Sequence, residues 1–328
     1  MERVTEMADA QLQTKPHHTV GTNRIINFLQ EIKKNWVLFL MMLPALAVLF
    51  INNYLPMSGM VVAFKDINYS KGIWGSDWLW FKNFEYLFKS NSAWIITRNV
   101  ILYNMVFIII SITIAVALAI ILNELLNRKI AKLYQSIMFF PYFLSWVVVS
   151  YLVFACLSSD MGYFNAILSR LGLESVQWYM ETKLWPWIIV AVNTWKWTGY
   201  DSIIYLATII GFDKAYYEAA AVDGATRWQQ ITKITIPMLK PVIIVLTLLK
   251  VGRMFYTDIG LFYNVPRNMG ILQDVTNTID TYVFRALRST GDIGMAAAAG
   301  FYQAIVGLSL VLIANYIVRK IDKDSALF

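Results

Sequence analysis

The sequence of 328 residues has few of the side chains on which soluble enzymes rely: one cysteine, two histidines and only 15% charged residues. A single cysteine, Cys156, excludes a disulfide within the chain, and its place in an apolar run argues against redox chemistry. His17 and His18 are adjacent in a polar N-terminal segment, which is typical of a solvated tail. Neither a metal centre nor a catalytic triad is therefore predicted.

Nucleotide-binding motifs are missing as well. The chain contains no G-x-x-x-x-G-K-[ST] phosphate loop and no hydrophilic stretch long enough for an ATPase domain. Any ATP hydrolysis linked to this chain is expected on a partner, and the chain itself is predicted to have no cofactor and no catalytic residue. The first 20 residues lack an apolar core, so no cleavable signal peptide is predicted. The sequence also shows no tandem repeat and no low-complexity linker.

The chain is instead rich in apolar residues. Hydrophobic residues make up 58% of it, and the mean hydropathy is +0.53. A helix needs about 20 apolar residues to cross ~30 Å of hydrocarbon, and such long runs favour helices over alternating barrel strands. Six segments qualify: Trp36–Leu55, Val100–Leu122, Ser136–Leu157, Leu184–Ile210, Ile236–Tyr256 and Gly294–Val318. The sequence predicts an all-α integral membrane protein with six transmembrane helices.

The distribution of lysine and arginine predicts the orientation. With six spans both termini lie on one side, and that side holds 14 of these residues in 83, against 10 in 107 on the other. The positive-inside rule therefore places both termini in the cytoplasm. The net charge of +7 is explained by this orientation, and no nucleic acid partner is predicted.

Three regions follow from these spans. Residues 1–35 form a cytoplasmic N-terminal segment, within which 22–35 mixes apolar and basic residues and predicts a short helix, either lying in the membrane interface or solvated. Residues 36–318 form the transmembrane domain, and 319–328 form a cytoplasmic tail.

A moderately polar stretch, EAAAVDGATRWQQITKITIP at residues 218–237, separates two strongly apolar segments. The alanines that follow Glu218 favour a helix, Asp223-Gly224 predicts a turn because glycine tolerates positive φ, and Pro237 suits the start of a new helix. Glu218 is expected near a helix start, where a carboxylate is favoured. Taken by residue type alone, this stretch would also fit an ordinary connecting helix.

The spacing of Glu218, Ala219, Ala220, Gly224 and Ile234 resembles the cytoplasmic EAA loop of ATP-binding-cassette (ABC) importer permeases. From residue 36 to 328 the order of spans resembles the maltose-type carbohydrate permeases, and IDTYVFRALRSTGDIGMAAAAGFYQ resembles their polysaccharide-uptake branch. One departure is Ile236, where the family often has leucine before the proline. The resemblance implies the type I importer permease fold with a coupling loop at about 213–235. The coupling residues it implies are Glu218, Ala219, Ala220, Asp223, Gly224 and Trp228.

The resemblance also implies the other components of the transporter. A second homologous permease, two ATP-binding subunits that hold ATP and Mg, and an extracytoplasmic solute-binding protein are the expected partners. The cargo is expected to be an oligosaccharide, which crosses the cytoplasmic membrane by alternating access.

Polar and charged residues inside spans are costly, and they usually face a cavity or a partner. Two spans are rich in them, and the last adds two more. The candidate substrate-pathway residues are Asn193, Trp195, Lys196, Trp197, Tyr200, Lys250, Arg253, Tyr256, Tyr302 and Gln303. Cations without matching carboxylates predict an acidic, uronate-containing saccharide such as alginate. The alternatives are tryptophans at a membrane interface and a Lys196–Asp201 pair, although five residues is a poor helical spacing.

Two other classes of function remain open from sequence. An ion-coupled secondary sugar transporter would explain six spans with buried charges, and Asp201 is its plausible coupling carboxylate. A membrane receptor or assembly subunit without transport is the other.

Overall fold

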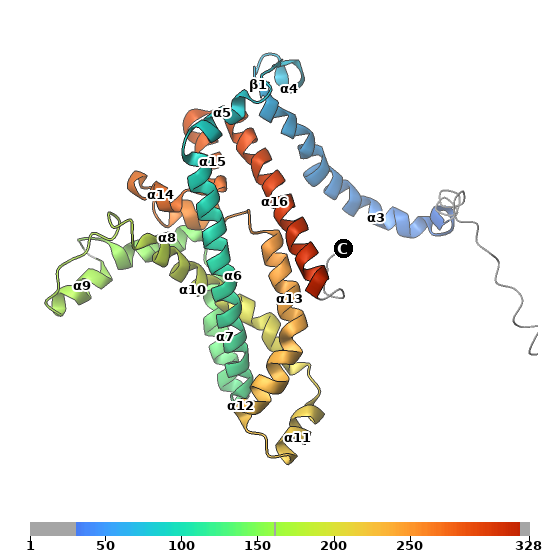
Figure 1. The fold of residues 1–328 in the computed structure, drawn as a ribbon, viewed down its shortest axis with the longest axis vertical. Coiled ribbons are helices and arrows are strands. Elements are labelled where there is room, and N and C mark those ends of the chain that lie inside the picture. The colour runs from blue at the N-terminus through green and yellow to red at the C-terminus, as the bar shows by residue number, and fades with distance from the viewer. Residues whose placement is uncertain (1–30, 161, 322–328) are drawn as a thin grey trace, which may run out of the picture. The chain divides into compact units, whose positions relative to one another are not determined.

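The computed structural model describes residues 31–160 and 162–321, and most of them are helical (Figure 1). The chain divides into two units, residues 1–60 and 61–328. Of the predicted N-terminal helix at 22–35, residues 22–30 lie outside the described part, as do residues 322–328 of the predicted tail.

The first unit is dominated by one apolar helical segment. Helix α3 (Trp36–Leu49) runs into a π-helical turn, η1 (Phe50–Tyr54), and then into the 3₁₀ segment η2 (Leu55–Phe64), whose last residues belong to the second unit. No charged residue occurs from Trp36 to Phe64, and this segment is long and apolar enough to span a membrane. The first predicted span is therefore helical, and it is longer than expected.

The second unit begins with a small antiparallel hairpin of β1 (Lys65–Asp66) and β2 (Asp77–Trp78), in which Lys65 lies opposite Trp78. The helices are α4 (Gly72–Gly75), α5 (Lys82–Lys89), α6 (Ser92–Glu124), α7 (Arg128–Phe143), α8 (Trp146–Leu157), α9 (Tyr163–Arg170), α10 (Trp185–Ile210), α11 (Lys214–Val222), α12 (Arg227–Gln230), α13 (Ile236–Gly252), α14 (Gln273–Thr276), α15 (Ile279–Arg285) and α16 (Ile293–Ile321). Short π or 3₁₀ turns are η3 (Ile231–Thr235), η4 (Gly260–Asn264), η5 (Gly270–Leu272) and η6 (Ala286–Thr290).

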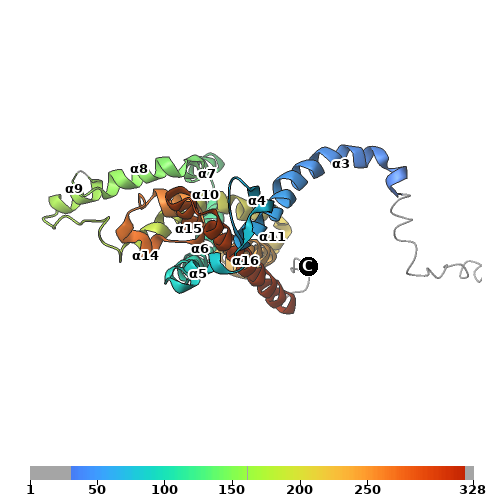
Figure 2. The same ribbon diagram turned by 90° about the horizontal axis from the view of Figure 1, so that it is seen from above.

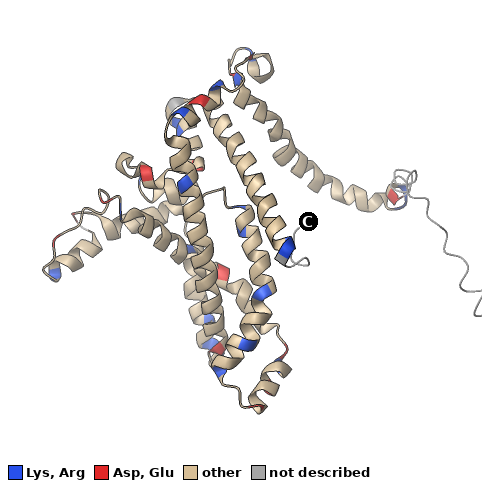
Figure 3. Cartoon of the chain, in the orientation of Figure 1, with Lys and Arg blue, Asp and Glu red and all other residues tan. Residues whose placement is uncertain are grey.

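Four apolar clusters hold this unit together, and the smallest joins Ala63 and Phe84 to Ala298 of α16. One joins α6, α10 and α13 through residues such as Ala119, Tyr205 and Leu239. A second joins α5, α6, α15 and α16, and a third joins α8 and α10 to the segment that contains η4 and η5. Figures 1 and 2 show α8 and α9 extending away from the α6, α13 and α16 helices. Charged residues are sparse along these long helices (Figure 3).

Length and composition support four membrane spans in the described residues, or five if a bent helix pair counts as one span. The four are Trp36–Phe64, Ser92–Glu124, Arg227–Gly252 and Ile293–Lys320. Helix α10 has 26 residues, the length of a span, but it is not among those that pass on hydropathy. Asn193, Lys196 and Asp201 lie in its middle and lower its mean hydropathy. The prediction of an all-α membrane protein is confirmed.

The prediction of one continuous span at Ser136–Leu157 is wrong. Helices α7 and α8 are separate, and their axes are bent by 101°. Leu144 is extended, and the Ser145 side chain accepts a hydrogen bond from the Val148 amide to start α8. Such a break is tolerated at membrane depth only where the freed backbone groups find partners within the protein.

Lys196 supplies those partners. Its ammonium, from the middle of α10, donates hydrogen bonds to the carbonyls of Pro141 (3.2 Å), Tyr142 (3.0 Å) and Leu144 at the end of α7. The same ammonium lies 5.2 Å from the centre of the Trp146 ring. Only 5% of Lys196 is exposed. A buried cation therefore serves as the C-terminal cap of a broken membrane helix.

The close approach of α10 to α7 requires glycine. A Cβ at Gly199 would lie 1.9 Å from the Met138 carbonyl oxygen and 2.3 Å from its carbon. Because both contacts are to backbone, no side-chain rotation relieves them. Gly199 thus fixes the spacing that lets Lys196 reach the end of α7.

Replacing Lys196 by methionine is expected to destabilise the protein strongly. The change keeps the apolar stem but leaves buried carbonyls without donors, and each unsatisfied group costs about 1–3 kcal/mol. The measurement is the melting temperature of the purified protein in detergent. Lys183→Met, which removes an exposed lysine two residues before α10, is the matched control; equal melting temperatures for the two variants would contradict the capping role.

Gly199→Ala is expected to separate α7 from α10 and to cost about 1–3 kcal/mol, as overpacking does. The control is Gly300→Ala in α16, where a Cβ would meet nothing within 4 Å; this change should be neutral or slightly stabilising, since alanine is the better helix former. Thermal unfolding of both variants checks the prediction. A Gly199→Ala protein as stable as the wild type would show that α7 and α10 can move apart without loss of stability, and it would contradict the prediction.

Candidate functional site

The predicted coupling loop folds as two short helices. Helix α11 starts at Lys214, with the Asp213 side chain accepting from the Ala215 amide at 2.9 Å. Gly224 forms the turn with φ +80°, and Thr226 with Gln229 makes a reciprocal capping box at the start of α12. Figure 1 shows α11 and α12 at the end of the unit where α6 finishes. The two loops predicted on the cytoplasmic side therefore lie at one end.

One detail of the sequence prediction is wrong. Glu218 is the fifth residue of α11, and the first turn of this helix contains no acidic residue. The helix starts earlier because Asp213 is the better cap: its side chain reaches the free amides that a helix start exposes. The Glu218 carboxylate is therefore exposed on the helix surface, where it is available to a partner.

The loop presents an exposed surface. Glu218, Ala219, Asp223 and Gly224 are exposed, Ala220 is half-buried, and 72% of Trp228 is accessible. The sequence analysis missed two apolar neighbours, Tyr216 and Val222, which are 58% and 88% exposed. Large exposed apolar side chains next to one another mark interaction surfaces. Only the folded arrangement reveals these two, because both residue types also fit a buried helix face.

The loop is joined mechanically to a membrane span. Residues Arg227–Gly252 form one helical segment, in which the π-helical turn η3 connects α12 to α13. The Tyr217 hydroxyl lies 3.0 Å from the Thr235 hydroxyl and ties α11 to this turn. The loop and α13 are therefore connected by continuous helix and by one hydrogen bond.

The aromatic candidates of α10 pack against α7. Tyr200 stacks on Tyr142 with ring centres 4.5 Å apart and an interplanar angle of 13°, and Trp197 meets Tyr142 edge-on at 5.4 Å. Trp195 is 47% exposed and Asn193 is half-buried. Trp197 and Tyr200 hence help to hold the two helices together while remaining partly accessible.

The charged candidates divide into three environments. Lys196 is enclosed by carbonyl oxygens, as described above. Lys250 forms an ion pair with Asp201, Nζ to Oδ2 at 2.5 Å, and donates to the Ser111 hydroxyl at 2.8 Å. The premise that the pathway cations lack matching carboxylates is therefore wrong for Lys250. The partner was missed because Asp201 lies on another helix, 49 residues away in sequence.

Arg253 is in the third environment. It is the exposed residue that ends α13, and no hydrogen bond or ion pair of its guanidinium occurs within the described part of the chain. Tyr256, one turn further on, is 51% exposed. Among the three predicted cations, Arg253 is the one whose charged group has no hydrogen bond or ion pair within the described residues.

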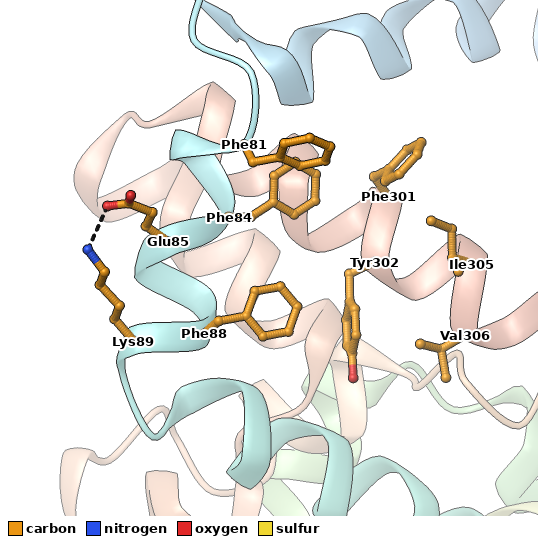
Figure 4. Close-up of a pocket in the computed structure, with 9 residues that line it drawn as sticks. All are labelled: Phe81, Phe84, Glu85, Phe88, Lys89, Phe301, Tyr302, Ile305 and Val306. Atoms are coloured by element: carbon orange, nitrogen blue, oxygen red, sulfur yellow. Dashed lines mark hydrogen bonds and ion pairs between the residues drawn. The ribbon is translucent and has the colours of Figure 1, made fainter.

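The two candidates on α16 point in different directions. Gln303 is 6% exposed, and its amide donates to the Phe255 carbonyl (2.8 Å) and to Asp280 (3.2 Å), so it is a packing residue of this unit. Tyr302 contacts the Thr97 hydroxyl at 3.0 Å and lines an apolar groove of about 520 Å³ with Phe88 and Phe301 (Figure 4). The structure brings Lys250 to α10 but does not bring Tyr302 and Gln303 onto one surface.

Comparisons with known proteins agree with this architecture. Residues 111–323 match the family described as "Binding-protein-dependent transport system inner membrane component". Protein LplB of Bacillus subtilis is 29% identical over 99% of both chains. The polygalacturonan/rhamnogalacturonan transport system permease protein YteP of the same organism is 32% identical over 88% of this chain and 89% of that one.

Solved structures agree as well. A bacterial ABC transporter involved in the import of the acidic polysaccharide alginate matches with a TM-score of 0.81 and 33% identity, covering 90% of this chain and 99% of that one. The alginate transporter in complex with its alginate pentasaccharide-bound periplasmic protein matches with a TM-score of 0.80. The family match covers well over half of the chain, and the helices follow the same path as in these transporters. This chain is therefore a membrane-embedded permease component of the binding-protein-dependent transport family, with the type I fold of ABC importer permeases.

Proposed function

We propose that this chain is one permease subunit of an ATP-driven importer that takes up an oligosaccharide delivered by an external binding protein. The observation that supports this most is the likeness to an alginate importer along 90% of the chain. A second permease and two ATPase subunits complete the complex, and the ATPases bind ATP and Mg. Alternating access of a cavity between the two permeases carries the cargo across the cytoplasmic membrane.

The proposed orientation places both termini and the α11–α12 loop in the cytoplasm. Tyr216, Val222 and Trp228 then form the apolar part of the surface that docks on an ATPase, and Glu218 adds a charge beside it. ATP-driven closure of the ATPases moves this surface. Since Arg227–Gly252 is one helical segment, the motion reaches the depth of Lys250 and Arg253 without an intervening flexible link.

The cargo is proposed to be acidic, and Arg253 is the residue that recognises it. A guanidinium forms a planar fork that fits a carboxylate with two parallel hydrogen bonds. Arg253 is exposed and is the C-cap of α13, three residues after Lys250. Tyr256 and Trp195 offer exposed aromatic surface for sugar rings in the same half of the unit.

The test of this proposal is uptake by the reconstituted complex. Proteoliposomes that contain both permeases and the ATPases, supplied with the binding protein, should take up a uronate oligosaccharide when ATP is inside. ATP-dependent uptake of neutral oligosaccharides alone would remove the acidic assignment, and no saccharide uptake at all would remove the function.

Gly224→Val is expected to reduce ATP-driven uptake by at least about tenfold, because a β-branched residue is strained at φ +80° and distorts the turn. A Cβ at this position meets nothing within 4 Å, so the effect comes from backbone conformation and not from a clash. Gly224→Asn is the matched control, since asparagine tolerates the left-handed region. Comparing the uptake rates of the two variants at equal amounts of assembled complex checks this; equal rates would show that the turn does not matter for coupling.

Arg253→Gln is expected to slow uptake of the acidic oligosaccharide by about tenfold, as the loss of one charge-assisted contact would. Arg170→Gln removes the same charge from the exposed end of α9 and should leave uptake unchanged. Initial uptake rates at saturating binding protein give the comparison. If both variants transport like the wild type, recognition of the carboxylate lies elsewhere.

A further inference from the structure

The ion pair between Lys250 and Asp201 lies where three helices meet. Lys250 belongs to α13, Asp201 to α10, and Ser111, which accepts from the same ammonium at 2.8 Å, to α6. Ser111 is about midway along the span Ser92–Glu124. The pair therefore lies about midway along α6 and close to the C-terminal end of α13.

This ion pair is not sealed inside the unit. The Lys250 side chain is 31% exposed and the Asp201 side chain 13%. An ammonium has three N–H donors, of which Asp201 and Ser111 take two. A charge with an open side within the spans is not stable against hydrocarbon, so that side is expected to face a water-filled cavity or a protein partner.

The same contacts show which of the three predicted pathway cations is paired with a carboxylate. Lys196 is enclosed by carbonyls, Lys250 is neutralised by Asp201, and Arg253 is open. Of the two cations with exposed side chains, Lys250 is thus paired with a carboxylate and Arg253 is not, so this part of the chain presents one unpaired positive charge. Without Asp201 it would present two, separated by three residues on the same helical segment.

We propose that Asp201 is a specificity-determining residue, which cancels the charge of Lys250 and so keeps an acidic saccharide from being held too tightly to leave. This inference rests on the proposed function. A pathway works when binding is strong enough to admit the cargo and weak enough to release it. Arg253 supplies attraction for the carboxylates, and the Lys250–Asp201 pair limits that attraction while leaving one N–H for hydrogen bonding to sugar hydroxyls.

A purely structural role for the ion pair makes a different prediction. If the pair only joins α13 to α10 and α6, removing either partner of the ammonium should weaken the protein without regard to the charge of the cargo. Ser111→Ala is the matched control, because it removes one hydrogen bond from Lys250 and leaves every charge in place.

The experiment measures release of labelled saccharide from the assembled complex in nanodiscs, trapped with vanadate in the ATP-closed state. The two probes are a uronate oligosaccharide and its carboxyl-reduced neutral counterpart. The variants are Asp201→Asn, Ser111→Ala, and two doubles that combine Asp201→Asn with Lys250→Arg or with Lys250→Gln. The Lys250→Arg double keeps a cation that cannot lose its proton, and the Lys250→Gln double removes both charges and avoids a lone buried lysine.

Asp201→Asn and its Lys250→Arg double should slow release of the uronate probe by roughly tenfold, since a unit charge at short range in protein is a strong interaction. Ser111→Ala and the Lys250→Gln double should release it within about twofold of the wild type, and the neutral probe should respond to none of the changes. The proposal is overturned if both Asp201→Asn proteins release the uronate probe at the wild-type rate, or if both probes slow equally. A wild-type complex that retains neither probe overturns the proposed function along with it.

Discussion

The satisfaction of backbone hydrogen bonds at the break between α7 and α8 is the constraint on which the rest of this structure depends. A helix end at membrane depth leaves carbonyls that water cannot reach. Lys196 meets that need from α10, and Gly199 lets the two helices approach closely enough for it to do so. A lysine in the middle of a span, which hydropathy alone would count against the helix, is in this way the residue that makes the broken helix possible.

The charge of Lys250 is also satisfied by residues on other helices. Lys196 and Lys250 both contact partners on other helices, and these contacts help to specify how α6, α7, α10 and α13 are arranged. Asp201, which a secondary transporter would use as a coupling carboxylate, is already paired with Lys250. Arg253 is left open at the end of the helical segment that starts in the coupling loop. In the proposed function, the residue that attracts the cargo therefore follows directly after the helix that carries the motion.

Much of the fold could be predicted from the sequence, because helices and turns depend mainly on residues that are close together in the chain. Long apolar runs predicted the helices, and the residues from Glu218 to Pro237 predicted a helix, a turn at Gly224 and a new helix near Pro237. The features that the sequence did not predict depend mostly on residues that are far apart in the chain. The break at Leu144 and the Lys250–Asp201 pair depend on contacts between helices far apart in the chain, and the Asp213 cap outcompeted the expected start near Glu218. The separation of Tyr302 from Gln303 follows from helix rotation, which residue types alone do not fix.

As the permease of an ATP-driven saccharide importer, this chain should leave the membrane together with its partner subunits. Purifying it from its native membrane in mild detergent and identifying what accompanies it in stoichiometric amount tests this most directly. The account predicts a second permease and a P-loop ATPase, whose ATP hydrolysis rises when a binding protein loaded with an acidic oligosaccharide is added. Recovery of the chain alone, or only with copies of itself, under conditions that preserve other membrane complexes would contradict it.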